Sequence, residues 1–485
     1  MTAFFCYNTH NVTEKKETTE MGEEKKLHEH KGFGSKLGFI LAAAGSAVGL
    51  GNIWRFPYLA AKYGGGFFLL VYIILAVTFG FTLMLTEIAI GRRTGKSVLG
   101  AYQAVEKHCA PMGWLAAFIP AVILPYYCAI GGWVLKYMTM FVTGQGLDTA
   151  HDVISPSGEA VPFFSSFIGD LGGPAVFFLV YVTLNVVVIL LGVQKGIEKV
   201  SKFMMPLLTL LIVGIAIYTM TLEGAWDGVA YYILPSFDDF SAEKLFKTVA
   251  GACSQLFYSM SIAMGILVTY GSYMKKEYSL EKSVRQIEIF DTAIAFLAGL
   301  IIVPAVYVFS NGDKSAINQG PGLMFITLPQ VFETMPGGQI IGAVFFVLVA
   351  LAALTSSISL METVVAAVME KFRLSRKVSC FIVLAITIVL GMLSVLGYSV
   401  WSGVTIFGMQ FLDFFDFITN SVMMPILALL TCILIGWVVK TSYVEDEVLH
   451  GEKKFSAKWM YRIMIKFVCP VCMVMILITA LFVEI

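Results

Sequence analysis

Long apolar stretches separated by short polar segments recur along most of the chain. Each is about twenty residues long or longer, which is enough for a helix to cross the ~30 Å hydrocarbon core of a membrane. Eleven such stretches lie at residues 37–60, 66–91, 113–142, 174–192, 200–222, 246–272, 286–309, 339–369, 378–399, 404–438 and 460–483. The pattern therefore predicts an all-α polytopic membrane protein with about eleven transmembrane helices.

Basic residues cluster after every second apolar span. Arg92 and Arg93 follow the second span, Lys371 and Arg373 follow the eighth, and similar clusters follow the fourth, sixth and tenth spans. The stretch 143–173 instead carries acidic residues and neither Lys nor Arg. By the positive-inside rule, we expect a cell-membrane protein whose N-terminus is cytoplasmic. Eleven spans would then place the C-terminus outside.

The composition fits a membrane protein and argues against several soluble classes. The chain is 58% hydrophobic and 14% charged with zero net charge, so nothing favours nucleic-acid binding. Its six histidines fall in predicted loops or tails, which argues against a metal-dependent enzyme. Cys469 and Cys472 have CxxC spacing but lie inside the last span, where we expect small buried side chains. Residues 1–32 are polar and predict a disordered cytoplasmic tail, with a transmembrane domain over 33–485.

The first apolar span is interrupted by residues that a plain membrane helix avoids. Within residues 45–57 it carries three glycines together with Asn52 and Arg55. Glycine lets the backbone leave helical geometry, and the freed polar groups cost several kcal/mol in hydrocarbon unless something satisfies them. A bound ion and a polar substrate could do so, as in the broken helices of secondary transporters. Alternatively, Gly45 and Gly49 serve close helix packing.

A second interruption lies in the sixth span, where small and hydroxyl residues gather at 257–265. Spans one and six are five apart, and an odd offset inverts their orientation. We therefore expect inverted repeats over residues 33–222 and 245–438, followed by an extra C-terminal helix over 455–485. On this pattern alone, ligand binding and helix packing are equally good explanations of the small residues.

At these residues the chain resembles a known family. The run GSAVGLGNIWRFPY at 45–58 closely resembles the first helix of the neurotransmitter:sodium symporter family, of the bacterial leucine or aromatic amino-acid transporter type. Further matching motifs, in the same order and spans, are GGGF at 64–67, EIAIGR at 87–92, PYY at 125–127, LTSS at 354–357 and DFFDF at 413–417. The resemblance implies a leucine-transporter-like (LeuT-like) fold, a 5+5 inverted repeat with broken helices 1 and 6. It also implies sodium-coupled symport of an amino acid by alternating access.

The resemblance implies two sodium sites and no organic cofactor. The first would use the Ala47 carbonyl, Asn52, Ser259, Asp291 and the substrate carboxylate; the second would use the carbonyls of Gly45, Val48 and Ala352 and the hydroxyls of Thr355 and Ser356. Oxygen ligands suit a hard cation such as sodium. The alternative for Thr355 and Ser356 is hydrogen bonding to the preceding helical turn. Asp291 stands where many members have Asn.

Chloride is not expected to be required. The positions that match the chloride site of animal members are Tyr72, Gln255, Ser259 and Ala295. Ala295 offers no hydroxyl, and Asp291 brings a negative charge close by.

The substrate class follows from Gly49, because amine-transporting members carry an Asp at the matching position. Gly49 leaves the space neutral, so that a substrate carboxylate can approach. The implied substrate-binding residues are Ser46, Ala47, Gly49, Gly51, Ile123, Tyr127, Tyr258, Ser259, Ser261, Met264, Ser356 and Leu360. Their wall is uncharged and largely apolar, which suits a neutral hydrophobic amino acid, aromatic first and leucine-like second. The alternative is a non-transporting amino-acid receptor or sensor on the same fold. We expect a monomer or weak oligomer in the lipid bilayer.

Gates are implied on both sides of the site. Arg55 and Asp416 could close the outer side through one or two waters, with Tyr127 and Tyr258 as an aromatic lid. Glu370 is the acidic member of an inner gate. The basic position opposite it departs from the family pattern, because His30 and Phe33 stand where a basic residue and a Trp are usual.

Overall fold

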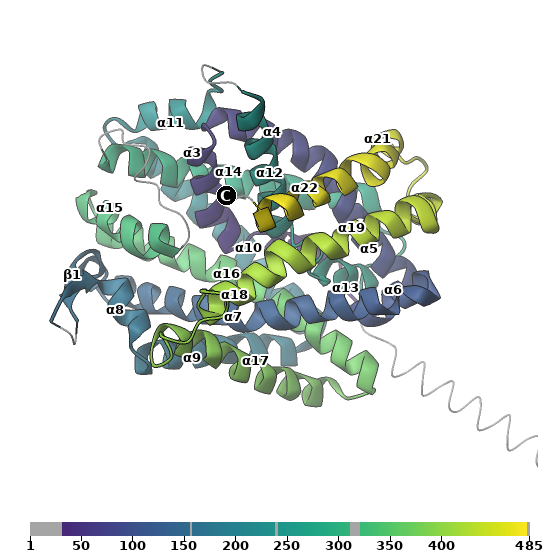
Figure 1. Ribbon diagram of the computed structural model, residues 1–485, viewed down its shortest axis with the longest axis horizontal. Coiled ribbons are helices and arrows are strands. Elements are labelled where there is room, and N and C mark those ends of the chain that lie inside the picture. The colour runs from purple at the N-terminus through teal and green to yellow at the C-terminus, as the bar shows by residue number, and fades with distance from the viewer. Residues whose placement is uncertain (1–31, 156–157, 238–240, 311–320, 483–485) are drawn as a thin grey trace, which may run out of the picture.

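The computed structural model describes residues 32–155, 158–237, 241–310 and 321–482 (Figure 1). The predicted tail over residues 1–32, with His30 and Lys31, lies outside these ranges except for its last residue. Within them, nine helices are long and apolar enough to span a membrane, and a pair bent by 55° provides a further span. The sixth expected span is divided between α12 (Ala242–Ser259) and α13 (Ile266–Ser272). All eleven predicted spans are therefore present as helices.

The first span consists of α2 (Lys36–Ala47), η1 (Gly51–Arg55) and α3 (Phe56–Lys62), and the second consists of α4 (Gly66–Leu75), η2 (Ala76–Gly80) and α5 (Phe81–Thr94). The third span is α7 (Ala110–Val142) and the fourth is α9 (Gly172–Leu190). The fifth span consists of η5 (Val193–Glu198) and α10 (Lys199–Met220). After the sixth come α14 (Leu280–Phe309), α16 (Gly338–Phe372) and α17 (Arg376–Tyr398). The tenth combines α18 (Phe411–Asp416), η8 (Phe417–Met423), α19 (Met424–Ile433) and η9 (Leu434–Val438). The eleventh combines α21 (Lys458–Ile463), η10 (Met464–Val468) and α22 (Cys469–Phe482).

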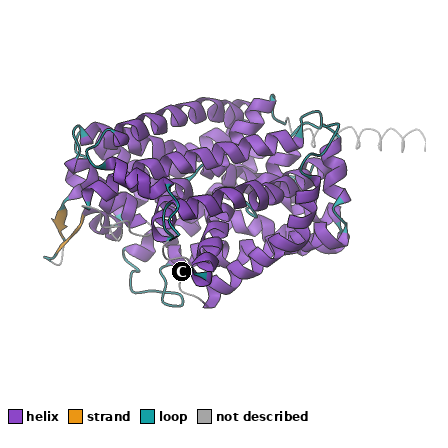
Figure 2. Cartoon of the chain, turned by 90° about the horizontal axis from the view of Figure 1, so that it is seen from above, coloured by secondary structure: helices purple, strands orange, loops and turns teal. Residues whose placement is uncertain are grey.

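Short elements connect the spans, and the apolar pattern did not predict them. They are α6 (Val98–Val105), η3 (Lys107–Cys109), η4 (Leu147–Ala150), α8 (Phe163–Gly169), α11 (Ala225–Ile233), η7 (Leu323–Thr327), α15 (Leu328–Thr334) and α20 (Ser442–Leu449). Strands β1 (Asp152–Ile154) and β2 (Ala160–Pro162) form an antiparallel hairpin in which Val153 pairs with Val161. In Figure 2 the strands stand at one end of an otherwise helical molecule.

Burial decides which spans line the interior. The apolar segment of α7 is 78% buried, whereas those of α9, α17 and the α21–α22 span are 39%, 39% and 33% buried. The third span therefore lies inside the bundle, packed against α16, and the other three are left to face lipid.

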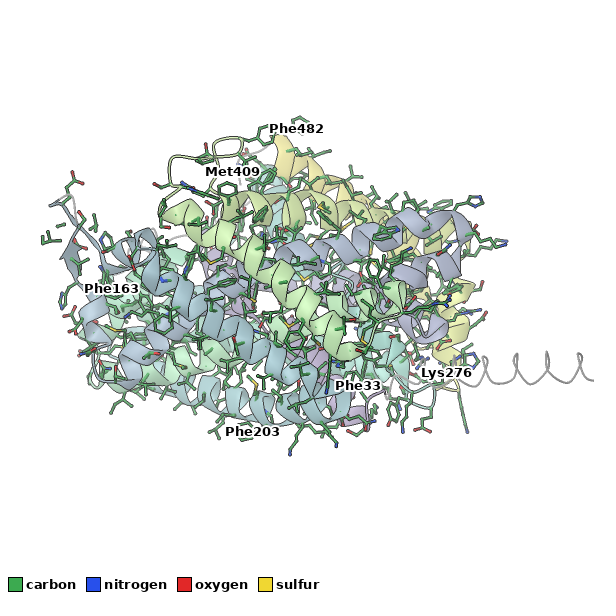
Figure 3. All side chains as sticks on the ribbon, turned by 90° about the horizontal axis from the view of Figure 1, so that it is seen from below. Phe33, Phe163, Phe203, Lys276, Met409 and Phe482 are labelled. Atoms are coloured by element: carbon green, nitrogen blue, oxygen red, sulfur yellow. The ribbon has the colours of Figure 1, made fainter. Side chains whose placement is uncertain are left out.

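The two ends of the bundle differ in their loops. Figure 1 shows β1, α8 and α15 at one end and α6 and α21 at the other. Phe163 and Lys276 mark these two ends in Figure 3. The acidic stretch 143–173 thus lies opposite the basic clusters, as the charge pattern predicts. The orientation of the bundle in the membrane and the division into inverted repeats stay predictions.

Candidate substrate and sodium sites

The first span breaks where the glycine run predicts. Helix α2 ends at Ala47, and Val48 adopts extended backbone geometry (φ −72°, ψ 98°) while its N–H donates to the Ala44 carbonyl. The chain becomes helical again at Gly51 with a π-helical turn. Carbonyls near the end of α2 therefore lose their helical partners and become available to other groups.

The sixth span breaks between Ser259 and Ile266. Ser261 and Ala263 have positive φ angles of 54° and 59°, and Gly265 follows with 71°. Side chains other than glycine rarely adopt this geometry, and such strain concentrates at functional sites. Glu87 supports the break because its Oε1 accepts a 2.7 Å hydrogen bond from the Ala263 N–H. Sequence reasoning noted Glu87 only as part of a family motif.

The two breaks lie against each other. The Ser261 hydroxyl donates to the Ser46 carbonyl at 3.0 Å, and the hydroxyl oxygens of these two serines are 3.1 Å apart. This contact joins residues that are 215 positions apart in the chain. The unwound segments thus form a single polar patch in the interior of an apolar bundle.

The first predicted sodium site contains a fully buried carboxylate. Asn52 Nδ2 donates to Asp291 Oδ1 at 2.7 Å, and the Ser259 hydroxyl lies 2.9 Å from both carboxylate oxygens. Asp291 forms no ion pair with a basic side chain of the described residues. Hydrogen bonds from neutral donors alone do not offset the free energy of desolvating a buried carboxylate. A cation bound here would therefore stabilise the charged form of Asp291. Of the remaining predicted ligands, Ala47 is buried at the end of α2.

The second predicted site gathers carbonyl oxygens around one hydroxyl. Ser356 Oγ lies 3.4 Å from the Gly45 carbonyl, 3.3 Å from those of Val48 and Ala352, and 3.0 Å from that of Ser46. The Ser46 and Ala352 carbonyls also accept hydrogen bonds from Ser261 and Thr355, whereas those of Gly45 and Val48 have no other side-chain donor among the described residues. A hydroxyl has one proton to donate, so Ser356 cannot fully satisfy both of the latter. Such a cluster of oxygens suits a hard cation.

Thr355 makes the contact that was the alternative to sodium ligation, namely a hydrogen bond to the preceding helical turn. Its hydroxyl donates to the Leu351 and Ala352 carbonyls at 3.1 and 3.0 Å, which is hydrogen bonding to the preceding turn. The oxygen keeps acceptor lone pairs while it donates, so this contact is compatible with cation ligation.

All twelve predicted substrate-binding residues line one small cavity, joined by Leu50, Asn52 and Ile266. Its walls leave no space for side chains at the glycines: a Cβ on Gly49 would lie 2.7 Å from Ser356 Oγ, and one on Gly51 would lie 2.4 Å from the Tyr258 ring. The cavity volume is about 20 Å³, room for about one water. A hydrophobic amino acid therefore needs lining side chains to move, for which flexible Met264 is suited. The roles of the individual residues stay predictions.

A second cavity of about 610 Å³ lies next to this pocket and shares Tyr258 with it. Arg55 and Asp416 both line it. Arg55 donates to Ser254 Oγ at 2.8 Å, and Asp416 accepts from the Tyr126 hydroxyl at 3.0 Å. The two charged side chains form no direct ion pair in the described structure. This separation is compatible with a water-bridged outer gate, whose role stays a prediction.

The inner side is held by contacts that sequence reasoning missed. Glu370 accepts a 2.6 Å hydrogen bond from the Ser97 N–H just before α6, and the basic partners expected for it lie outside the described residues. Its gate role thus stays untested. Glu362 instead pairs with Arg376 and accepts from the Tyr273 hydroxyl at 2.8 Å. The available signal was an acidic residue within the apolar eighth span.

The positions implied for chloride are also buried. The Tyr72 hydroxyl and Gln255 Oε1 have no hydrogen-bond partner among the described residues, and Ala295 is fully buried. Gln255 Nε2 donates to the Gly51 carbonyl at 3.0 Å, which ties this region to the first break.

Comparisons with known proteins agree with the predicted family. The family model described as "Sodium:neurotransmitter symporter family" matches residues 30–151 and 159–484. The uncharacterized sodium-dependent transporter YhdH of Bacillus subtilis is 34% identical over 463 residues, covering 94% of this chain and 98% of its own. The mouse sodium- and chloride-dependent GABA transporter 2 is 25% identical over 471 residues, covering 88% of this chain and 76% of its own.

A solved structure gives the same result for the fold. The crystal structure of MhsT in complex with L-phenylalanine superposes with a TM-score of 0.81 at 35% identity, covering 93% of this chain and 99% of that chain. The predicted all-α LeuT-like fold is confirmed. The chain belongs to the sodium:neurotransmitter symporter family and is a sodium-dependent membrane transporter rather than an enzyme.

Proposed function

We propose that this transporter couples sodium entry to the uptake of a neutral hydrophobic amino acid, aromatic in preference to branched aliphatic. The observation that carries the proposal is the pocket between the two helix breaks, whose side chains bear no charge apart from the nearby Asp291. An uncharged pocket of this kind favours apolar side chains. The complex of MhsT with L-phenylalanine supports the same class of substrate.

The breaks offer partners for both charged ends of an amino acid. The Leu50 N–H donates to the Tyr127 hydroxyl oxygen at 3.4 Å. The hydroxyl keeps its own proton to donate, and together with the backbone amides after Gly49 it provides donors for a carboxylate. The open carbonyls near Ser46 provide acceptors for an ammonium group. Gly49 keeps this space free because a side chain there would meet Tyr127 and Ser356.

The two oxygen clusters would bind one sodium ion each, with different electrostatics. The first contains the full negative charge of Asp291, whereas the second is built from carbonyls and hydroxyls around Ser356. The substrate carboxylate would complete the first site. Sodium binding and substrate binding would therefore depend on each other through a shared contact.

The first prediction concerns this dependence. Purified protein is expected to bind radiolabelled phenylalanine in sodium and to lose binding when potassium replaces sodium. Unlabelled tryptophan and leucine should compete, whereas glutamate and lysine should not, because the pocket wall has no charge to pair with theirs. Binding of equal strength in potassium would contradict the proposal.

The same protein in liposomes separates transport from sensing. An inward sodium gradient should drive accumulation of phenylalanine, and dissipating the gradient should stop it. Sodium-dependent binding without any accumulation would favour the alternative function, a non-transporting receptor or sensor.

The second prediction is chloride-independent transport. Asp291 supplies negative charge beside the first cluster, and Ala295 cannot coordinate an anion. Uptake should be equal in chloride and in gluconate. The double variant Asp291→Asn, Ala295→Ser should gain chloride dependence, while Ala295→Ser alone serves as the matched control. A large loss of uptake by the unmodified protein in gluconate would show that Asp291 does not replace the anion.

A further inference from the structure

A basic cavity lies between the tenth and eleventh spans, away from the substrate pocket. Its volume is about 450 Å³, and Trp437, Lys440, Ser442, Arg462 and Lys466 contribute to its lining. None of its lining residues belongs to the substrate cavity or to the outer cavity. Nothing in the sodium or substrate chemistry described above uses it.

The cavity has more positive than negative charge. Lys440 is exposed and Lys466 half-buried, and neither forms an ion pair with an acidic side chain in the part of the chain that the structure describes. Arg462 is paired with Glu445 at 2.6 Å, and Lys458 contacts the same carboxylate at 3.0 Å.

Glu445 does not cancel this excess. Burial raises the pKa of Glu445, but hydrogen bonds from Arg462, Thr441 and Lys458 outweigh it and lower the pKa to about 2. The carboxylate is therefore ionised at neutral pH. Its single charge faces both Arg462 and Lys458, which leaves Lys440 and Lys466 uncompensated.

Lys466 lies within a membrane-spanning segment, where an unpaired charge has an unfavourable solvation free energy. It belongs to η10, inside the apolar eleventh span. Its ammonium lies 5.8 Å from the centre of the Trp437 ring, and Trp437 Nε1 donates to the Lys466 carbonyl at 3.3 Å. Tryptophan favours the membrane–water interface, and a lysine at that depth needs an anionic partner or access to water.

Apolar side chains continue from the cavity along both spans. Those that face outward include Ile433 and Trp437 on the tenth span and Ile463, Phe467 and Val471 on the eleventh, with 42–67% of each exposed. Figure 1 shows α19, α21 and α22 next to one another, between the middle of the view and its right side, and α19 packs against α22. A charged head and apolar tails could thus be bound side by side along these two spans.

We propose that this cavity binds the phosphate headgroup of an anionic phospholipid, whose acyl chains lie on the apolar face between the tenth and eleventh spans. The lysines match the charge of a phosphate, the tryptophan matches the depth of the headgroup region, and the flanking side chains match the tails. The positive-inside rule predicts that this end of the molecule, with its basic loops, faces the cytoplasm, so the lipid would belong to the cytoplasmic leaflet.

The test uses the full chain in a neutral detergent with equal amounts of dioleoylphosphatidylglycerol and dioleoylphosphatidylcholine, and native mass spectrometry to count retained lipids. The unmodified protein should retain phosphatidylglycerol preferentially. Lys440→Gln with Lys466→Gln should weaken its retention by about five-fold for each lysine. Lys453→Gln with Lys454→Gln is the matched control, because it removes two cations from the neighbouring exposed loop; its retention should be unchanged.

Three results would overturn the proposal. Equal retention of the two lipids would show that the cavity does not select for charge. Equal losses of phosphatidylglycerol retention in the test and control variants would show that the net charge of the protein, and not this cavity, determines lipid retention. Displacement of the lipid by glycerol phosphate would assign the cavity to a soluble phosphate compound. If the double variant does not fold, Lys440→Gln alone carries the test, because Lys440 is an exposed loop residue.

Discussion

Replacing Thr355 and Ser356 together by alanine is expected to remove most of the sodium activation of substrate binding and transport. Ser356 Oγ stands among the carbonyls around the first break, at 3.0 to 3.4 Å. A polar contact to a charged group is worth roughly 1.5–3 kcal/mol. Since 1.4 kcal/mol is about tenfold in an equilibrium constant, the sodium concentration for half-activation should rise at least about tenfold.

A matched control separates ligation from local helix effects. Thr363 is a buried hydroxyl residue on the same helix, and it donates to the Ser359 carbonyl in the preceding turn at 2.9 Å. Thr363→Ala removes the same kind of local contact but lies two turns from the cluster. Sodium titration of phenylalanine binding should shift only in the Thr355/Ser356 variant. If the sodium titration shifts to a similar extent in both variants, the hydroxyls of Thr355 and Ser356 act by hydrogen bonding within the helix and not as sodium ligands.

The helical spans were predictable because their signal is local. Twenty apolar residues in a row have few alternatives in a membrane, and all eleven predicted spans form helices, although the tenth begins at Phe411 rather than at residue 404. Short elements such as α6 and α20 lack that signal, since eight residues are too few for a clear apolar period.

The two helix breaks were predictable to different degrees. Glycines mark the first break directly, and the chain leaves helical geometry among them at Val48. The second break depends on positive φ angles at Ser261 and Ala263, residue types that do not favour this geometry. Local rules fail at such positions because the rest of the fold enforces the strain.

The residues of the candidate site were predicted from the resemblance to a known family. The spacing of apolar residues along the chain did not identify them. That resemblance named twelve residues from four spans, and the structure places them around one cavity. It did not reveal which distant groups support them. Glu87 reaches the Ala263 amide across 176 positions, and only the packing of the second span against the sixth brings them together.

Gly49→Ala is expected to weaken substrate binding by about fivefold to over a hundredfold in a protein that still folds. The new methyl group would lie 2.7 Å from Ser356 Oγ and 3.1 Å from the Tyr127 hydroxyl, both closer than ordinary van der Waals contact. It would also enter the cavity where the substrate carboxylate is proposed to lie. Overpacking of this kind costs roughly 1–3 kcal/mol. In the free energy of substrate binding, that cost corresponds to a loss of about fivefold to over a hundredfold in affinity. The space that the methyl group takes from the substrate lowers the affinity further.

The matched control is Gly214→Ala, because a Cβ on Gly214 in α10 meets nothing within 4 Å. Alanine favours a helix over glycine by up to about 1 kcal/mol, so this variant should be as stable as the parent or more so. Thermal unfolding of both variants, followed by phenylalanine binding in saturating sodium, distinguishes a blocked pocket from a damaged fold. Parental affinity in folded Gly49→Ala would mean that the substrate does not lie against Gly49. The neutral space at this position would then no longer explain the choice of an amino acid over an amine.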